Sequence, residues 1–178
     1  KKIEKGFDYI FSPELPPSAT NEKASSNAMN LANIAQNRNV TKKGFKRGSI
    51  QNILKGAGRC YENVWGDIVQ SGLNRKGLAP TGGTHGQNHA TDFAEWAETN
   101  GKNVVSRVGV NPNDKRLGLL PGDIIVLKAG WYAGNEAGHI EIVGKDGSGY
   151  SDFKDTDLRI VKASLDKIMG VYRLKDKS

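Results

Sequence analysis

The sequence predicts an α+β domain in which helices come first and an antiparallel sheet follows. Before about residue 100, apolar residues recur at helical spacing, and after Pro121 they form short continuous runs separated by turns that contain glycine. Helices and strands that occupy separate parts of a chain are typical of this class. A chain of 178 residues is long enough to bury the core of one domain.

Residues 1–25 are expected to form an extended N-terminal arm, and residues 26–178 a single domain. The arm contains prolines among serine, threonine, asparagine and lysine, a composition that favours neither helix nor strand. From Ser26 onward, helical spacing is shown by Met29, Leu31, Ala32, Ile34 and Ala35. A second helix is expected to begin at Ser49 and to bury Ile50, Ile53 and Leu54.

The next predicted helix carries the only cysteine of the chain. Residues 56–58, Gly-Ala-Gly, interrupt regular structure just before Cys60, and a helix ending near Gly72 is predicted by Tyr61, Val64, Trp65, Ile68 and Val69. Cys60 is therefore expected in the first turn. After a glycine-rich loop at 82–86, a short helix that ends at residues 100–101 carries Phe93, Ala94, Trp96 and Ala97.

Four strands are expected in the second half of the chain. Residues 123–127 and 139–143 are continuous apolar runs, and residues 150–153 and 170–174 complete the sheet. Glycine-containing turns separate them, which indicates antiparallel connections.

Composition limits the environment and the partners of the domain. Lysine and arginine outnumber the acids 26 to 19, and the net charge of +7 favours an acidic polymer, either cell-wall material or nucleic acid. No apolar stretch approaches the roughly 18 residues of a membrane span, and the N-terminus lacks an apolar signal core. A single cysteine cannot form an intramolecular disulfide, so its chemistry is that of a free thiol.

The position of Cys60 suits a nucleophile. A thiol attacks as the thiolate, and the unpaired N–H groups at a helix N-terminus favour that anion. The alternative is that Cys60 is a small buried apolar residue, a common role for a lone cysteine beside an apolar helix face.

Two motifs in the second half of the chain favour the catalytic interpretation. Residues 120–126 are Leu-Pro-Gly-Asp-Ile-Ile-Val, and residues 138–143 are Gly-His-Ile-Glu-Ile-Val. A cysteine that opens a helix, followed by Pro-Gly-Asp with an apolar strand and by Gly-His with an apolar strand, resembles the NlpC/P60 and CHAP families. The resemblance covers about residues 56–174. The run from 138 to 153 is also similar to cysteine hydrolases of phage lysins and of cell-wall toxins delivered between bacteria.

The resemblance implies a papain-like core, in which a helix bearing the cysteine packs on an antiparallel sheet bearing the histidine. It also implies hydrolysis of amide bonds in peptidoglycan stem peptides or cross-bridges, with Cys60 as nucleophile, His139 as base and no cofactor. Such an enzyme acts in the periplasm or cell wall of a bacterium, as a lysin, a delivered toxin or a remodelling enzyme. A delivered toxin would need an immunity protein in its producer.

A third polar residue is needed to orient the imidazole. Asp152 is the first choice, because a neighbouring strand would bring it alongside His139. Glu141 is the alternative, because residues two apart on a strand share a face with His139. The backbone N–H of Cys60 is expected to stabilise the oxyanion, with Tyr61 as a further donor. Trp131 and Tyr132 form either a wall of the substrate cleft or an apolar plug under their loop.

Three other interpretations remain open. His85 and His89 are four residues apart and could bind zinc with His139 or Cys60, although the surrounding Gly-Gly-Thr-His-Gly is a poor helix. The charge and the aromatic residues could instead serve a non-catalytic module that binds cell wall or nucleic acid, but no nucleic-acid motif is present. The same Cys-His pair could also act on protein amides, as a deamidase or an acyltransferase.

Overall fold

The computed structural model describes residues 23–41, 59–74, 76–77, 90–131 and 138–176. Within these residues the fold is α+β, with helices in the first half and an antiparallel sheet in the second, as the sequence predicts. Most of the expected arm, the helix expected at Ser49 and the glycine-rich loop lie outside the described residues. None of the described helices is both long and apolar enough to cross a bilayer.

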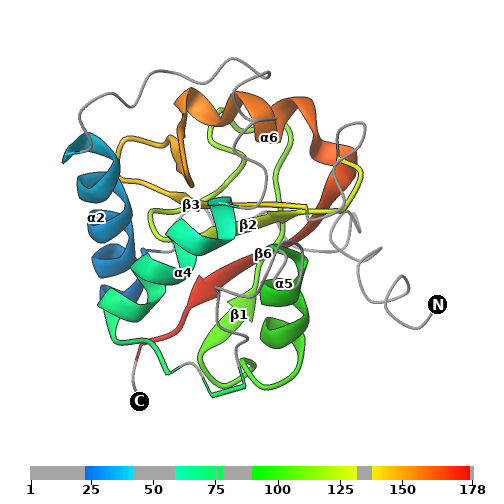
Figure 1. The fold of residues 1–178 in the computed structure, drawn as a ribbon. Coiled ribbons are helices and arrows are strands. Elements are labelled where there is room, and N and C mark those ends of the chain that lie inside the picture. Colours follow the sequence, from blue (N-terminus) through cyan, green and yellow to red (C-terminus); the bar gives the residue numbers. More distant parts are fainter. Residues whose placement is uncertain (1–22, 42–58, 75, 78–89, 132–137, 177–178) are drawn as a thin grey trace.

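Three helices lie on one face of the sheet (Figure 1). Helix α2, Ser26–Thr41, begins where the hydroxyl of Ser25 accepts a hydrogen bond from the N–H of Ala28 at 3.0 Å, an N-cap interaction. Helix α4 is Arg59–Ser71, and it ends at Gly72, whose φ is +76°. Helix α5 is Ala90–Glu98. All three helices were expected, but Val69 of α4 is exposed and Met29 and Ile34 of α2 are only half-buried.

The described strands form one antiparallel sheet in the order β1-β6-β2-β3-β4-β5. Their bounds are Val105–Arg107 for β1, Ile124–Leu127 for β2, His139–Val143 for β3, Gly149–Tyr150 for β4, Lys154–Asp155 for β5 and Ile168–Leu174 for β6. Strand β1 is not among the expected strands. The expected strand 150–153 is shorter than predicted, because the chain bends at 151–153 and returns as β5.

Both faces of the sheet are covered. On one face, Ile124, Ile140 and Ile142 pack against α2, α4 and α5. On the other face, Ile125, Val143 and Val171 pack in a second cluster with Leu158 and Val161. Val161 belongs to α6, Arg159–Ala163, which lies between two short 3-10 turns, Thr156–Leu158 and Leu165–Lys167.

The Pro-Gly-Asp motif forms a structural turn before β2. Gly122 has a φ of +89°, and its Cα lies against the backbone of Ala28 in α2, so any side chain there would collide with that helix. Asp123 is fully buried and accepts two hydrogen bonds from Arg173 of β6, each 2.8 Å long. It also accepts the N–H of Leu120 at 2.8 Å. The aspartate of the motif therefore ties β2 to β6.

Candidate active site

Helix α4 and strand β3 bring Cys60 and His139 together. Cys60 is the second residue of α4, which packs against β3, and His139 is the first residue of that strand. The thiol is a neighbour of the imidazole, close enough to raise its pKa. Both residues are buried, with exposed fractions of 6% for Cys60 and 3% for His139.

The imidazole of His139 is held on three sides. Its Nε2 lies 2.9 Å from Oε1 of Glu141, which leaves Nδ1 as the ring nitrogen for Cys60. The ring of Phe153 stacks on the imidazole, with centroids 5.3 Å apart and planes at 16°. Trp131 lies at the same centroid distance with planes at 35°. The imidazole is therefore fixed in one orientation between the thiol and a carboxyl group.

Gly138 allows this placement of His139. Its φ is +74°, and a Cβ there would approach the side chain of Thr91 and the backbone of Leu127 more closely than real Cβ atoms do. The Gly-His pair of the motif thus has a physical reason: only glycine lets β3 begin so close to its neighbours.

Asp152, the first choice for orienting His139, lies in the bend between β4 and β5 and not on a strand. The bend is held by a hydrogen bond from the N–H of Ser151 to the carbonyl of Phe153, 3.0 Å long, and the Ser151 hydroxyl donates to Oδ1 of Asp152 at 3.1 Å. Asp152 acts on His139 through its charge. The carboxyl group in contact with Nε2 is that of Glu141.

Glu141 continues the contact to a second buried carboxyl group, that of Asp155 on β5. The carboxyl group of Glu141 lies over Gly149, which pairs with Asp155 across β4 and β5, so the two carboxyl groups are neighbours, and both residues are almost completely buried. Asp155 accepts the backbone N–H of Ile160 at 3.0 and 3.1 Å and that of Val161 at 3.4 Å. Two neighbouring carboxyl groups away from water repel each other when both are ionised, so a proton shared by the pair is favoured.

Burial and neighbouring charges shift the pKa values of the three buried groups at the site. Burial raises the pKa of Glu141 to about 8, the interaction with the Asp155 side chain opposes this increase, and the charge of Asp152 adds to it. Burial and the charge of Glu141 raise the pKa of Asp155 to about 8, against the N–H donors of Ile160 and Val161. Burial lowers the pKa of His139, but the hydrogen bond and charge interaction with Cys60, aided by Asp152 and Asp155, outweigh burial and raise it.

The other predicted site residues fall in different places. Trp131 is half-buried, contacts His139 and packs against the second core cluster, so it lies beside the site and also belongs to the apolar packing. Tyr61 is 1% exposed in the main core, and burial followed by the charge of Asp92 raises its pKa, so its ring gives no support to a substrate contact. Tyr132 lies outside the described residues.

The structure describes neither His85 nor His89, so the zinc hypothesis falls on residues outside its range. Among the described residues, no group of three or more His, Cys, Asp or Glu side chains is arranged to hold a metal ion.

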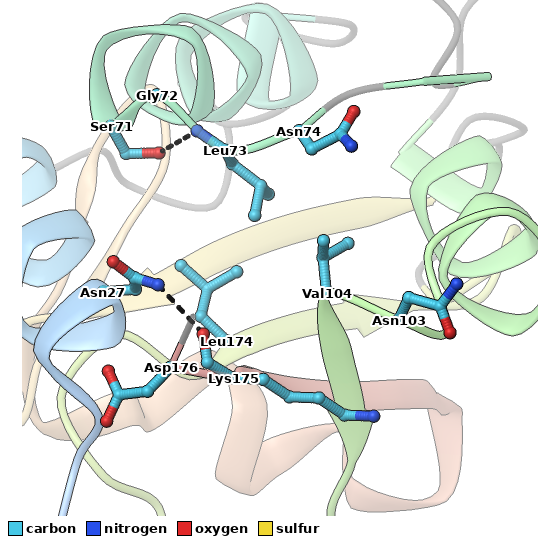
Figure 2. A pocket seen from close by; sticks show the side chains of 10 residues that line it. All are labelled: Asn27, Ser71, Gly72, Leu73, Asn74, Asn103, Val104, Leu174, Lys175 and Asp176. Atoms are coloured by element: carbon cyan, nitrogen blue, oxygen red, sulfur yellow. Dashed lines mark hydrogen bonds between the residues drawn. The ribbon is translucent and has the colours of Figure 1, made fainter. Parts of the chain in front are cut away.

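A cavity of about 420 Å³ lies at the other end of α4 (Figure 2). Ser71, the last residue of α4, lines it, about 16 Å along the helix axis from Cys60 at 1.5 Å per residue. Hydrogen bonds within the protein engage polar groups of its wall: the amide of Asn27 donates to the carbonyl of Lys175 at 3.0 Å, and the N–H of Leu73 to the hydroxyl of Ser71 at 3.3 Å. The cavity is separate from the Cys60–His139 pair.

The arrangement supplies a thiol, a base in contact with it and a buried carboxyl pair behind the base. Sequence reasoning identified Cys60, His139 and Glu141 but missed Asp155 and Phe153. Asp155 stands directly before a helical turn, a position that favours aspartate as an N-cap, so a local signal for it was present. Phe153 had no comparable signal, because its contact with His139 arises from the bend at 151–153.

Comparisons with protein-family models, curated proteins and solved structures find no match for this chain.

Proposed function

We propose that this protein is a cysteine hydrolase that cleaves amide bonds in the peptide part of bacterial peptidoglycan. The observation that carries the proposal is the juxtaposition of Cys60, in the first turn of α4, with His139 at the start of β3, against which that helix packs. A helix N-terminus favours a thiolate, and a neighbouring imidazole accepts the thiol proton. The same pairing of a helix with an antiparallel sheet supports a papain-like core.

In the proposed mechanism, His139 takes the proton of Cys60, and the sulfur attacks the amide carbonyl to form a tetrahedral oxyanion. The backbone N–H of Cys60, near the start of α4, is available to stabilise that oxyanion. The imidazolium then returns its proton to the leaving amine, which departs as the acyl-enzyme forms. Water, deprotonated by His139, hydrolyses the thioester and regenerates the thiol.

Peptidoglycan is proposed as substrate because of the motif resemblance, and the net charge of +7 favours this anionic polymer. The proposed setting is the periplasm or cell wall of a bacterium, and an immunity protein is a proposed partner if the enzyme is a delivered toxin.

Digestion of purified sacculi tests the proposal. Wild-type protein should release soluble peptide fragments, identified by mass spectrometry, and Cys60→Ala should reduce the rate by on the order of 10⁴-fold or more, because the nucleophile is gone. Val69→Ala is a matched control, since Val69 lies on the same helix with 37% of its surface exposed. Equal fragment release by wild type and Cys60→Ala would remove Cys60 from catalysis and refute the proposal.

A further inference from the structure

We propose that Asp155 is a positioning residue that keeps Glu141 protonated, so that the imidazole of His139 is held by a neutral carboxyl group and not by a carboxylate. This inference rests on the proposed function for its catalytic meaning. Its geometry is independent of the substrate.

The side-chain contacts form a continuous chain from the sulfur of Cys60 to helix α6. Cys60 contacts His139, Nε2 of His139 lies 2.9 Å from Oε1 of Glu141, and Glu141 contacts Asp155. Asp155 in turn accepts the N–H groups of Ile160 and Val161 at the start of α6. In the contacts of Glu141 with His139 and of Asp155 with α6, the donor is the imidazole or a backbone N–H group. Between the two carboxyl groups, no such donor determines where the proton lies.

The donors decide which carboxyl group carries the shared proton. Both oxygens of Asp155 accept backbone N–H groups, which stabilise a carboxylate there. Oε2 of Glu141 is buried and meets no N–H or O–H donor of the described chain; it lies against Gly149, where a side chain would collide with it. A buried carboxylate oxygen without a donor is unfavourable, whereas a protonated Oε2 can donate to Asp155. The stable pattern is therefore a neutral Glu141 beside an ionised Asp155.

A neutral Glu141 changes how strongly the imidazolium form of His139 is stabilised. Among the described residues, the titratable groups that face Glu141 are His139 on its own strand, Asp152 in the β4–β5 bend and Asp155 on β5, and Cys60 of α4 faces the imidazole. A carboxylate in contact with Nε2 would stabilise the imidazolium more strongly than a neutral carboxyl group does. Because the negative charge lies on Asp155 and not on Glu141, the neutral carboxyl group orients the imidazole of His139, which remains a base of moderate strength.

Two isosteric substitutions separate the neutral from the ionised state of Glu141. Glutamine reproduces the protonated glutamic acid: its carbonyl accepts from Nε2 of His139 and its amide N–H₂ donates to Asp155. Asparagine at position 155 does the opposite, because its carbonyl keeps the N–H of Ile160 while its amide donates to Glu141 and favours a carboxylate there. Asp152→Asn is the matched control, since it removes a nearby negative charge outside the chain.

The test is an NMR titration of the His139 ring in each variant, combined with Cys60→Ala so that the thiol does not titrate with it. The resonance is distinguished from those of the other two histidines by its loss in His139→Gln. Glu141→Gln should leave the measured pKa of His139 within about 0.5 of the parent value, and Asp155→Asn should raise it by about 1 or more, as expected for a new contact with an anion. Asp152→Asn should lower it.

A fall of about 1 or more in Glu141→Gln would show that Glu141 is ionised in the parent protein and would overturn the inference. An unchanged pKa in a folded Asp155→Asn variant would overturn it as well. If Asp155→Asn does not fold, Glu141→Gln alone decides. Because the titration needs no substrate, its outcome is distinct from the sacculus digestion: loss of the proposed function leaves the titration result standing, and the reverse also holds.

Discussion

Gly149 shows how closely the carboxyl pair is packed. The carboxyl group of Glu141 occupies the space where a side chain at position 149 would lie, so only glycine fits there. The glycine in β4 thus determines where Glu141, and through it the imidazole of His139, can lie.

Gly149→Ala should therefore reduce catalysis. The added methyl group should push the carboxyl of Glu141 away from Nε2 of His139, and a displacement of about 1 Å in such a constellation lowers turnover by about 10²-fold. The measurement is the rate of fragment release from sacculi. Gly66→Ala is the control: nothing lies within 4 Å of that position in α4, and the variant should keep its rate while gaining up to about 1 kcal/mol of helix stability. Equal rates for both variants would argue against this role of Gly149.

The sequence identified the residues of the candidate site better than it identified which of them contact one another. Cys60 and His139 stand out because each opens a regular element, and the structure brings them into contact. The choice between Asp152 and Glu141 depended on where β4 ends. A bend of three residues, 151–153, decides that point, and no periodicity distinguishes it from a continuing strand.

The buried pair of Asp123 and Arg173 joins strands β2 and β6. Asp123→Ala should destabilise the fold by about 3–5 kcal/mol, because it leaves the guanidinium of Arg173 buried without its carboxylate. The free energy of unfolding in urea measures the loss. Lys154→Ala removes a partly exposed ion pair with Asp146 and should cost at most about 1 kcal/mol. Losses of similar size in both variants would contradict the anchoring role of Asp123.

Helices and strands long enough to show a repeating pattern of apolar residues were predicted, and shorter ones were not. Helices α2, α4 and α5 and strands β2, β3 and β6 correspond to predicted elements. Strand β1 has three residues and α6 has five, too few for an apolar pattern to repeat. Arg173 was missed as the partner of Asp123 because the two lie 50 positions apart and only the pairing of β2 with β6 brings them together.

At the scale of the whole molecule, the site should make stability depend on pH. Burial and their mutual interaction raise the pKa values of the coupled pair Glu141 and Asp155 to about 8, so the folded pair keeps its shared proton up to about that pH, and the pKa of His139 is also raised. The folded protein therefore holds protons that the unfolded chain releases, so this stabilisation is complete below about pH 4 and is lost as the pH rises towards and through about 8.

Glu141→Gln should flatten this dependence. Glutamine does not ionise, so position 141 no longer loses a proton as the pH rises through the raised pKa of Glu141. Between about pH 5 and pH 9, wild type should lose more unfolding free energy than the variant, by on the order of a few kcal/mol. Urea midpoints at the two pH values measure the difference. Parallel curves for the two proteins would mean that the carboxyl pair is ionised in the folded state.

The order of the sheet has a consequence for biosynthesis. Of the strands that the structure describes, β6 is made last, yet it lies inside the sheet, between the edge strand β1 and β2. A nascent chain that stops before residue 168 would leave the edges of β1 and β2 open, and such edges invite aggregation. It would also lack Arg173, so the turn that precedes β2 would lose its anchor. A partly synthesised copy should thus be insoluble and inert, which would delay the proposed activity until translation has passed β6.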